Sequence, residues 1–452
     1  MGLIVGDKIK LDIRKQGING EGIGYYNKTL VFVPGAITKE KIYAEVVFVT
    51  NNYAIANIID FIRKSTKRVE PLCKYYKDCG GCQMQHIEYT EQLKIKQSIL
   101  KQSLKKYTNI DLNKIKIDKT LGMNYPYKYR NRSQMPFKNT NFGLALGFYK
   151  PNTNNFVYVD ECIIHHDKIN LINKTALRIL RKYKFKAYDK QNKEGVLLFL
   201  VTRYFEQTDS ASITFVIKEY KDKLKEVAND LIKELSIIKS VSYTINDQKT
   251  SLVITDRIKM INGKSWINSN FKDFKIKVSP DAFHQLNTVQ MGLMYDHIID
   301  NIELNKNSVV FDLYSGIGIT SLILAKQSHM VYGIDYSKAS IKDAYENAKI
   351  NKIDNVKFIT GHVEKEMPKL IKLGIKPNLV IMDPPRKGLD RSIIESILRI
   401  KPKQIVYISC NPSTLAKNLK DLLKLYNIKS IKPVDMFPNT ASVESITIMS
   451  LK

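Results

Sequence analysis

A cysteine and a glutamate late in the chain have the residue types and surroundings needed for covalent chemistry on a pyrimidine ring. Cys410 stands in the polar run SCNPST, and a helix is expected to begin near Ser413. Because a helix N-terminus lowers the pKa of a thiol, we expect Cys410 to be a reactive thiolate rather than a buried core thiol. Carbon 5 of a pyrimidine becomes nucleophilic only after a group adds at carbon 6, and a thiolate can supply that group. Glu444, at the start of a late strand, is the candidate base for removing the carbon-5 proton.

A glycine turn and two strand-end carboxylates indicate a nucleoside cofactor. In DLYSGIG, Gly316 and Gly318 let the backbone pass close to a ligand. Ser321 stands where the dinucleotide fingerprint has its third glycine, so the turn favours S-adenosylmethionine over a nicotinamide cofactor. Asp335, after the next strand, can accept hydrogen bonds from both ribose hydroxyls. Asp383, in DPPRKG, follows a further strand and is expected at the same edge of the sheet.

The other four cysteines are spaced for a metal site. The thiols are Cys73, Cys79, Cys82 and Cys162, which is enough to close a zinc site or to ligate a [4Fe–4S] cluster. Three clustered ligands with one remote thiolate suit an iron–sulfur cluster better than the paired CxxC motifs of zinc ribbons. An odd total of five cysteines argues against a disulfide framework. Four unrelated buried thiols remain the plain alternative.

Charge and aromatic patterning point to a nucleic-acid partner. The chain has 72 Lys and Arg against 44 Asp and Glu, a net charge of +28, which favours a polyanionic partner. An AT-biased genome, which the abundance of Lys, Ile and Asn suggests, also raises the lysine count. In YPYKYRNR, rings alternate with cations as in proteins that stack and neutralise single strands. Carbon 5 of a pyrimidine is out of reach in paired RNA, so the target base is expected to be unpaired or flipped out. The candidate RNA contacts are Lys128, Tyr129, Arg130 and Arg132.

Three structural units are expected to carry these residues. Short apolar runs separated by glycines predict a small β-barrel over 1–62. Mixed strand and helix patterns predict an α+β middle domain with the cysteine site over 63–275. From 276 to 452, short apolar strands alternate with helices, as in a Rossmann-like, doubly wound and mostly parallel sheet. The sheet would bring its strand ends, and therefore the cofactor and pyrimidine residues, to one rim.

The sequence shows neither a membrane-spanning segment nor a signal peptide. No apolar run approaches the roughly 18 residues that a membrane span requires, and the N-terminus lacks the apolar core of a signal peptide. We expect a cytoplasmic protein that acts as a monomer.

Four segments resemble the RNA (uracil-5-)-methyltransferases: DPPRKGLD, YISCNPSTLAKNL, DMFPNTASVE and PDAFHQLN. The N-terminal barrel resembles the TRAM domain of many members. The resemblance implies that Cys410 is the nucleophile and Glu444 the proton acceptor. It also implies contacts in the cofactor and substrate cleft for Gln285, Tyr314, Asp335 and Asp383.

Two positions depart from the family pattern. Ser442 stands where the family usually has a histidine, which puts a proton relay through that imidazole in question, and His362 stands where Asp or Asn commonly faces the adenine.

The cysteine spacing is similar to that of members that carry [4Fe–4S], chiefly those that act on 23S ribosomal RNA.

The resulting prediction is methylation of carbon 5 of a uridine in 23S ribosomal RNA, with S-adenosylmethionine as donor. A transfer RNA substrate is the first alternative. A cytosine-5 enzyme would need a second, Pro-Cys cysteine where this chain has DPPR. A non-catalytic RNA-binding or assembly factor would not need Cys410 and Glu444.

Overall fold

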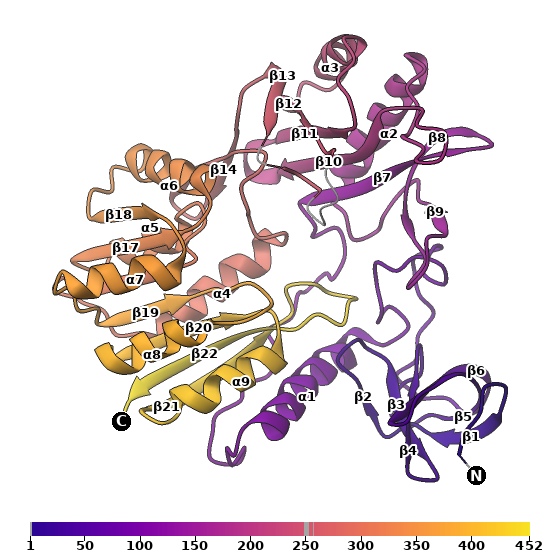
Figure 1. Cartoon of the computed structure of the whole chain (residues 1–452), viewed down its shortest axis with the longest axis horizontal. Helices are drawn as coiled ribbons and strands as arrows, with labels where there is room; N and C mark the ends of the chain where they lie inside the picture. The colour runs from indigo at the N-terminus through magenta and orange to yellow at the C-terminus, as the bar shows by residue number, and fades with distance from the viewer. Residues whose placement is uncertain (1, 248–252, 256) are drawn as a thin grey trace.

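The N-terminal unit is a small six-stranded β structure, shown in indigo in Figure 1. The structure, a computed structural model, describes residues 2–247, 253–255 and 257–452. Along β5, Ile42, Ala44 and Val46 face the core while the residues between them face outward, which is the period of two of a half-buried strand. The strands, in the sheet order β1-β5-β6-β4-β3-β2, are β1 (Lys8–Asp12), β2 (Lys15–Gln16), β3 (Gly22–Tyr26), β4 (Thr29–Val33), β5 (Lys41–Val49) and β6 (Tyr53–Arg63).

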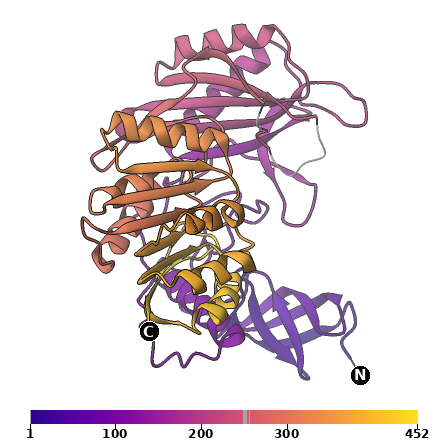
Figure 2. The same ribbon diagram turned by 60° about the vertical axis from the view of Figure 1, so that its left-hand side comes forward.

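The middle unit is a seven-stranded sheet with two helices packed on it. Its order is β13-β12-β11-β10-β7-β8-β9, and only the pair β11 and β12 is parallel among its described pairs. Figure 2 shows this unit and the N-terminal barrel at opposite ends of the molecule, with the C-terminal sheet between them. The elements are β7 (Arg132–Thr140), β8 (Gly143–Tyr149), β9 (Phe156–Tyr158), α2 (Asp167–Lys182), β10 (Leu197–Phe205), a short 3-10 helix (Glu206–Thr208), β11 (Ser210–Ile217), α3 (Lys223–Glu234), β12 (Ile238–Ile245) and β13 (Ile258–Gly263).

The C-terminal unit is a doubly wound sheet of order β18-β17-β16-β19-β20-β22-β21, in which β22 alone runs antiparallel to both of its neighbours. One apolar core gathers α4, α5 and α6 on one face, and another gathers α7, α8 and α9 on the other face. The predicted fold class is therefore confirmed. The elements are α4 (Thr288–Asn301), β16 (Val309–Leu313), α5 (Ile319–Ala325), β17 (Met330–Asp335), α6 (Lys338–Ile350), β18 (Val356–Thr360), α7 (Val363–Lys372), β19 (Leu379–Met382), α8 (Arg391–Ile400), β20 (Gln404–Ser409), α9 (Pro412–Leu422), β21 (Tyr426–Val434) and β22 (Glu444–Leu451).

Two segments that precede the doubly wound sheet in the chain pack against it. Helix α1 (Tyr89–Tyr107) places Leu100 and Leu104 in the same core as α9. The hairpin of β14 (Ile267–Phe271) and β15 (Phe274–Val278) completes the core on the other face. The predicted border between 275 and 276 falls inside β15, so the C-terminal unit uses chain on both sides of it.

Among the described residues, no helix combines the length and the apolar content that crossing a bilayer requires.

Candidate functional site

The antiparallel pairing of β20 with β22 places the predicted nucleophile opposite the predicted base. Ser409 pairs with Ser445, so the next residues, Cys410 and Glu444, face each other across the two strands. Helix α9 follows at once, and Asn411 caps it by accepting hydrogen bonds from the next two free backbone amides. We call the strand ends around Cys410, Glu444 and Asp383 the catalytic rim.

The thiol of Cys410 is not activated by its helix in the way the sequence suggested. Burial raises the pKa of Cys410 to about 11, and the nearby carboxyls of Glu444 and Asp383 add to this rise. The positive charge of Arg386 lowers the pKa without cancelling the rise. The expectation of a lowered pKa was wrong, because burial beside two acids outweighs the start of α9.

Two carboxyls of the rim hold their protons more tightly than usual. Burial raises the pKa of Glu444, with a further rise from the charge of Asp383, while Arg386 opposes it. Burial also raises the pKa of Asp383, which lies near the carboxylate of Asp312. The charge of Arg386 thus lowers the pKa of both Cys410 and Glu444. No role for this residue was predicted from the sequence. The signal was its place in DPPR, three residues after Asp383.

The glycine turn leaves open space where a ligand could approach. Tyr314, Gly316 and Gly318 have φ of 67°, 53° and 84°, in the left-handed region that favours glycine. A Cβ on Gly318 would stand 2.8 Å from the ring of Phe358, whereas one on Gly316 would meet nothing within 4 Å. The turn must therefore be glycine at 318 for packing, and at 316 it borders free volume.

Polar groups line that free volume. The carboxylate of Asp335 accepts hydrogen bonds from the amides of Gly316 (3.0 Å) and Ser337 (2.8 Å), and burial raises its pKa. The buried hydroxyl of Ser315 has no hydrogen-bond partner among the described residues. An orphaned hydroxyl, a fixed carboxylate and an open backbone turn fit the polar groups of S-adenosylmethionine.

The neighbouring acid and the two departures from the family pattern are also placed. The Asp312 carboxylate accepts a 2.6 Å hydrogen bond from Ser321, so it braces α5, and burial raises its pKa to about 7. Of the two departures, His362 stacks on Tyr336 just after the end of β17, with ring centroids 6.0 Å apart and an interplanar angle of 15°. The backbone amide of Ser442, the other departure, donates to the hydroxyl of Thr440 at 3.3 Å.

Gln285 reaches the rim from the loop between β15 and α4. Its side-chain amide lies 3.5 Å from the Asp383 carboxylate. Its carbonyl accepts a 2.9 Å hydrogen bond from Asn131, and Arg203 of β10 donates to the carbonyls of Ser279 and Ala282 in the same loop. The middle unit therefore supports a residue of the C-terminal site.

The four remaining cysteines line one cavity of about 220 Å³ together with Arg130, and none of them is in a disulfide. The sequence prediction that Cys162 joins the three clustered cysteines fits this arrangement. In the described part of the chain, no three His, Cys, Asp or Glu side chains are placed to hold a metal ion. The four cysteines thus share a cavity but do not converge on a metal position, and the iron–sulfur cluster stays a prediction.

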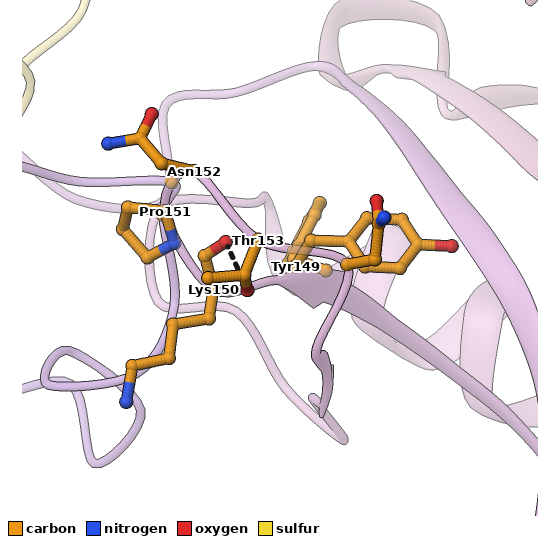
Figure 3. A pocket seen from close by; sticks show the side chains of 9 residues that line it. Tyr149, Lys150, Pro151, Asn152 and Thr153 are labelled. Carbon is orange, nitrogen blue, oxygen red and sulfur yellow. Dashed lines mark hydrogen bonds between the residues drawn. The ribbon is translucent and has the colours of Figure 1, made fainter.

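A second, more open cavity of about 510 Å³ adjoins the cysteine cavity and shares Gly81 and Phe148 with it. Figure 3 shows its rim, where the hydroxyl of Thr153 donates to the carbonyl of Lys150. The side chain of Lys150 extends away from this turn (Figure 3). Its ammonium group donates to the carboxylate of Asp78 at 3.3 Å.

The candidate RNA run divides between surface and interior. Tyr129 is buried and its hydroxyl donates to the carbonyl of Pro438 at 3.1 Å, so the prediction that its ring stacks on a base was wrong. Arg130 lines the cysteine cavity instead of the surface. Lys128 is exposed and pairs with Asp167 at 2.8 Å, and Arg132 is half-buried, with no ion pair in the described ranges.

Comparison with known proteins decides the family. Residues 88–452 match the family model described as tRNA (Uracil-5-)-methyltransferase, and residues 3–59 match the TRAM domain. The chain belongs to the tRNA (uracil-5-)-methyltransferase family. The match includes the catalytic rim, the glycine turn and the cysteine Cys162, and the TRAM match coincides with the N-terminal barrel.

Similar proteins cover the chain from end to end. An uncharacterised RNA methyltransferase of Bacillus anthracis is 36% identical over 451 residues, covering 100% of this chain and 98% of the relative. One from Clostridium acetobutylicum is 38% identical over 435 residues, covering 96% and 95%. A solved structure of Pyrococcus abyssi tRNA (uracil-54, C5)-methyltransferase with S-adenosyl-L-homocysteine matches with a TM-score of 0.77 and 26% identity, covering 97% of this chain and 99% of that one.

As a member of the uracil-5-methyltransferase family, the chain is an S-adenosylmethionine-dependent RNA methyltransferase. The predicted RNA methyltransferase activity, S-adenosylmethionine as methyl donor and the RNA partner are confirmed at this level.

Proposed function

We propose that this enzyme methylates carbon 5 of an unpaired uridine in 23S ribosomal RNA through a covalent adduct between Cys410 and carbon 6 of the base. The observation that carries the proposal is the register of β20 and β22, which sets Cys410 and Glu444 on adjacent strand ends. One group can add to one edge of the ring while the other reaches the proton on the neighbouring carbon.

Each residue of the rim has a separate task. The thiolate of Cys410 adds to carbon 6, and the electron pair moves into an enolate that makes carbon 5 nucleophilic. Bound S-adenosylmethionine supplies the methyl group that carbon 5 takes. Glu444 then accepts the carbon-5 proton, and the electrons of that bond reform the ring double bond and expel the thiolate. Arg386 stabilises the anionic forms of both residues.

The cofactor is assigned to the glycine turn. Asp335 is assigned to accept hydrogen bonds from the ribose hydroxyls, and Gly316 gives the cofactor close access to the backbone, while Gly318 allows the turn to pack against Phe358. Tyr314 and Gln285 border the space between this turn and Asp383, so we assign them to the cleft where cofactor and uracil meet.

The four cysteines are proposed to ligate a [4Fe–4S] cluster. They are unpaired thiols around one cavity, and Arg130 in the same wall offsets part of the negative charge of four thiolates. A cluster holds its thiolates farther apart than a single ion does, which suits ligands that line a cavity without converging on one point. Iron, sulfide and zinc analysis of anaerobically purified protein tests this, and stoichiometric zinc without iron would contradict it.

A 23S ribosomal RNA target is supported by this cysteine set, whose spacing resembles that of ribosomal RNA enzymes. Transfer RNA is the second candidate, because the Pyrococcus abyssi protein that is similar over 97% of this chain is named for uracil 54 of transfer RNA. Mass-spectrometric mapping of 5-methyluridine in both RNA fractions of a deletion strain separates them. Loss from transfer RNA alone would replace the first candidate by the second.

The covalent step has its own test. RNA that carries 5-fluorouridine cannot lose the group at carbon 5, so the enzyme is expected to stay attached to it after methyl transfer. Peptide mapping of the SDS-resistant complex is expected to find the RNA on Cys410. Turnover of normal RNA with no complex on the fluorinated RNA would exclude the adduct.

A further inference from the structure

The segment that delivers Glu444 is held by a buried ion pair. This segment, the 435–443 loop, runs from the end of β21 to the first residue of β22. Its first residue, Asp435, forms an ion pair with Lys96 of α1, and both side chains are 0% exposed. The other carboxylate oxygen of Asp435 accepts a 2.8 Å hydrogen bond from the hydroxyl of Tyr89. Both carboxylate oxygens of Asp435 therefore have a hydrogen-bond partner.

Helix α1 grips the loop at two further points. The ammonium of Lys96 also donates to the carbonyl of Phe437 at 3.1 Å, so one side chain spans the first turn of the loop. The amide side chain of Gln92 exchanges hydrogen bonds with Asn439, donating to its Oδ1 (3.2 Å) and accepting from its backbone amide (3.1 Å). Asn439 has φ of 67°, a backbone conformation that is costly for a residue with a Cβ and needs such support.

Three further segments contact the loop: the cysteine segment, the start of α4 and residues 126–129. The amides of Gln83 and Met84 donate to the carbonyl of Asn439 at 3.1 and 3.0 Å. Gln290 donates to the carbonyl of Asp435 (3.0 Å), and Asn287 donates to that of Met436 (3.1 Å). Residues 126–129 also contribute, since the Tyr129 hydroxyl donates to the carbonyl of Pro438 (3.1 Å) and the Asn439 side chain donates to the carbonyl of Pro126 (2.8 Å). Four segments thus bind the polar atoms of the loop, and among the partners named here only Lys96 is charged.

We propose that Lys96 and Asp435 form a positioning pair, which fixes the 435–443 loop and thereby directs the Glu444 carboxyl at the substrate held by Cys410. The inference rests on the proposed role of Glu444 as the base. Neither residue of the pair is assigned a contact with RNA or cofactor, so they act through the loop.

Stability alone does not account for a buried pair at this place. Removing both charges from water costs about as much as their attraction returns, and an apolar pair of similar volume is often equally stable. What an apolar pair cannot do is donate to the carbonyl of Phe437 and accept from Tyr89. Directionality is therefore the property that the charges add.

The test separates stability from position. Lys96→Met and Asp435→Asn each leave one buried polar partner unmatched, and both are expected to lower the melting temperature. The double variant Lys96→Met/Asp435→Leu removes both charges and is expected to recover most of the melting temperature. Release of methylated RNA from the Cys410 adduct is expected to stay roughly 10- to 100-fold slow in the double variant. Formation of the adduct is expected to change much less.

A second ion pair, in which Glu40 is buried and Arg68 is partly exposed, provides the control. Arg68 and Glu40 join the N-terminal barrel to the following segment at 2.7 Å, and neither residue contacts the loop through a described hydrogen bond. Glu40→Gln is expected to lower the melting temperature while adduct release keeps its wild-type rate. If Glu40→Gln slows release as much as the double variant does, the proposal is overturned.

Hydrogen exchange gives a readout that does not depend on the role of Glu444. Peptides covering 435–443 are expected to exchange at least about tenfold faster in the double variant, with the α8 peptides unchanged. Wild-type exchange in the loop, or wild-type release by the double variant, would overturn the proposal. If Glu444→Gln releases RNA normally while the loop still loosens in the double variant, the positioning of the loop stands and the assignment of the base fails.

Discussion

The catalytic rim and the cysteine cavity bring distant residues together in different ways. At the rim, Cys410 and Glu444 are set by the hydrogen-bond register of two strands, so their separation is fixed before any ligand arrives. At the cavity, Cys162 meets three cysteines of another segment across loops, and the side chains surround a space without converging. A site built on strand ends is organised by the fold, whereas a site built on loops depends more on the group that it holds.

The largest expected effects break the rim. Cys410→Ala is expected to lower the rate of methylation by roughly three orders of magnitude or more, because without the thiol the enolate does not form. Glu444→Gln is expected to methylate its RNA and then remain attached, giving a retarded band in SDS gels. Gel shift and product analysis on the same reactions check both. Formation of methylated RNA by Cys410→Ala would instead indicate that the methylated atom is a heteroatom, because methylation there needs no covalent intermediate.

Removing one cysteine of the cavity probes the other side of the comparison. Cys162→Ser is expected to reduce bound iron from about four per chain to a small fraction and to lower the melting temperature by several degrees. Because the cofactor turn lies in a different unit, the affinity for S-adenosylhomocysteine is expected to stay within about twofold of wild type. An unchanged iron content with Cys162→Ser would remove this residue from the ligand set.

A smaller effect is expected at the cofactor turn. Asp335→Ala strands the amides of Gly316 and Ser337 and removes the ribose acceptor, so the binding free energy of S-adenosylhomocysteine is expected to fall by about 1–3 kcal/mol. Calorimetry measures this directly. Asp273→Ala is the control, since it removes an acid from an exposed surface pair and is expected to leave the affinity unchanged.

Arg386 allows the electrostatics of the rim to be tested. Burial beside acids raises the pKa values of Cys410 and Glu444, and both residues act in their deprotonated forms, so the rate is expected to rise from neutral toward alkaline pH. Arg386 lowers both pKa values, so Arg386→Ala is expected to move this rise to higher pH. At neutral pH the loss is expected to be about three- to tenfold, and it shrinks as the pH approaches the pKa of the thiol. A profile that falls in rate without moving along the pH axis would show that the charge has another task.

The smallest expected effects concern the RNA surface. Arg132→Ala and Lys128→Ala are each expected to reduce the slope of log affinity against log salt by about one, with the larger loss of affinity at Arg132 because Lys128 already has Asp167 as a partner. Tyr129→Phe removes only a buried hydrogen bond, so it is expected to cost stability and not RNA affinity. Filter binding over a salt series distinguishes these outcomes.

Sequence reasoning reached the parts of the molecule that are encoded locally. The alternation of short strands and helices after 276 predicted the doubly wound sheet, and parallel strands must gather their ends at one edge, so Cys410, Asp335 and Asp383 were expected together. The cysteine spacing likewise led to the shared cavity. Glu444 was identified from its place at the start of a strand. The sequence alone did not predict that this strand, β22, is antiparallel and lies between β20 and β21.

What the sequence did not reveal depends on packing between distant segments. The pKa of Cys410 was misjudged because the helix start is visible in the sequence, whereas burial and the approach of Glu444 are not. Tyr129 belongs to a run whose alternating rings and cations suggested an exposed surface, but its side chain is buried against the 435–443 loop. The pairing of Lys96 with Asp435 carries no local signal, because a lysine in a helix is ordinarily solvated.

The distance along the chain between Lys96 and Asp435 has a consequence for biosynthesis. The two residues are 339 positions apart, and at roughly 5–20 residues per second the ribosome needs roughly 20–70 s to make the chain between them. During that time α1 can form, but its lysine has no counter-ion and the base has not been translated. The catalytic site can therefore close only after β22, the last strand to be translated, has been inserted between β20 and β21.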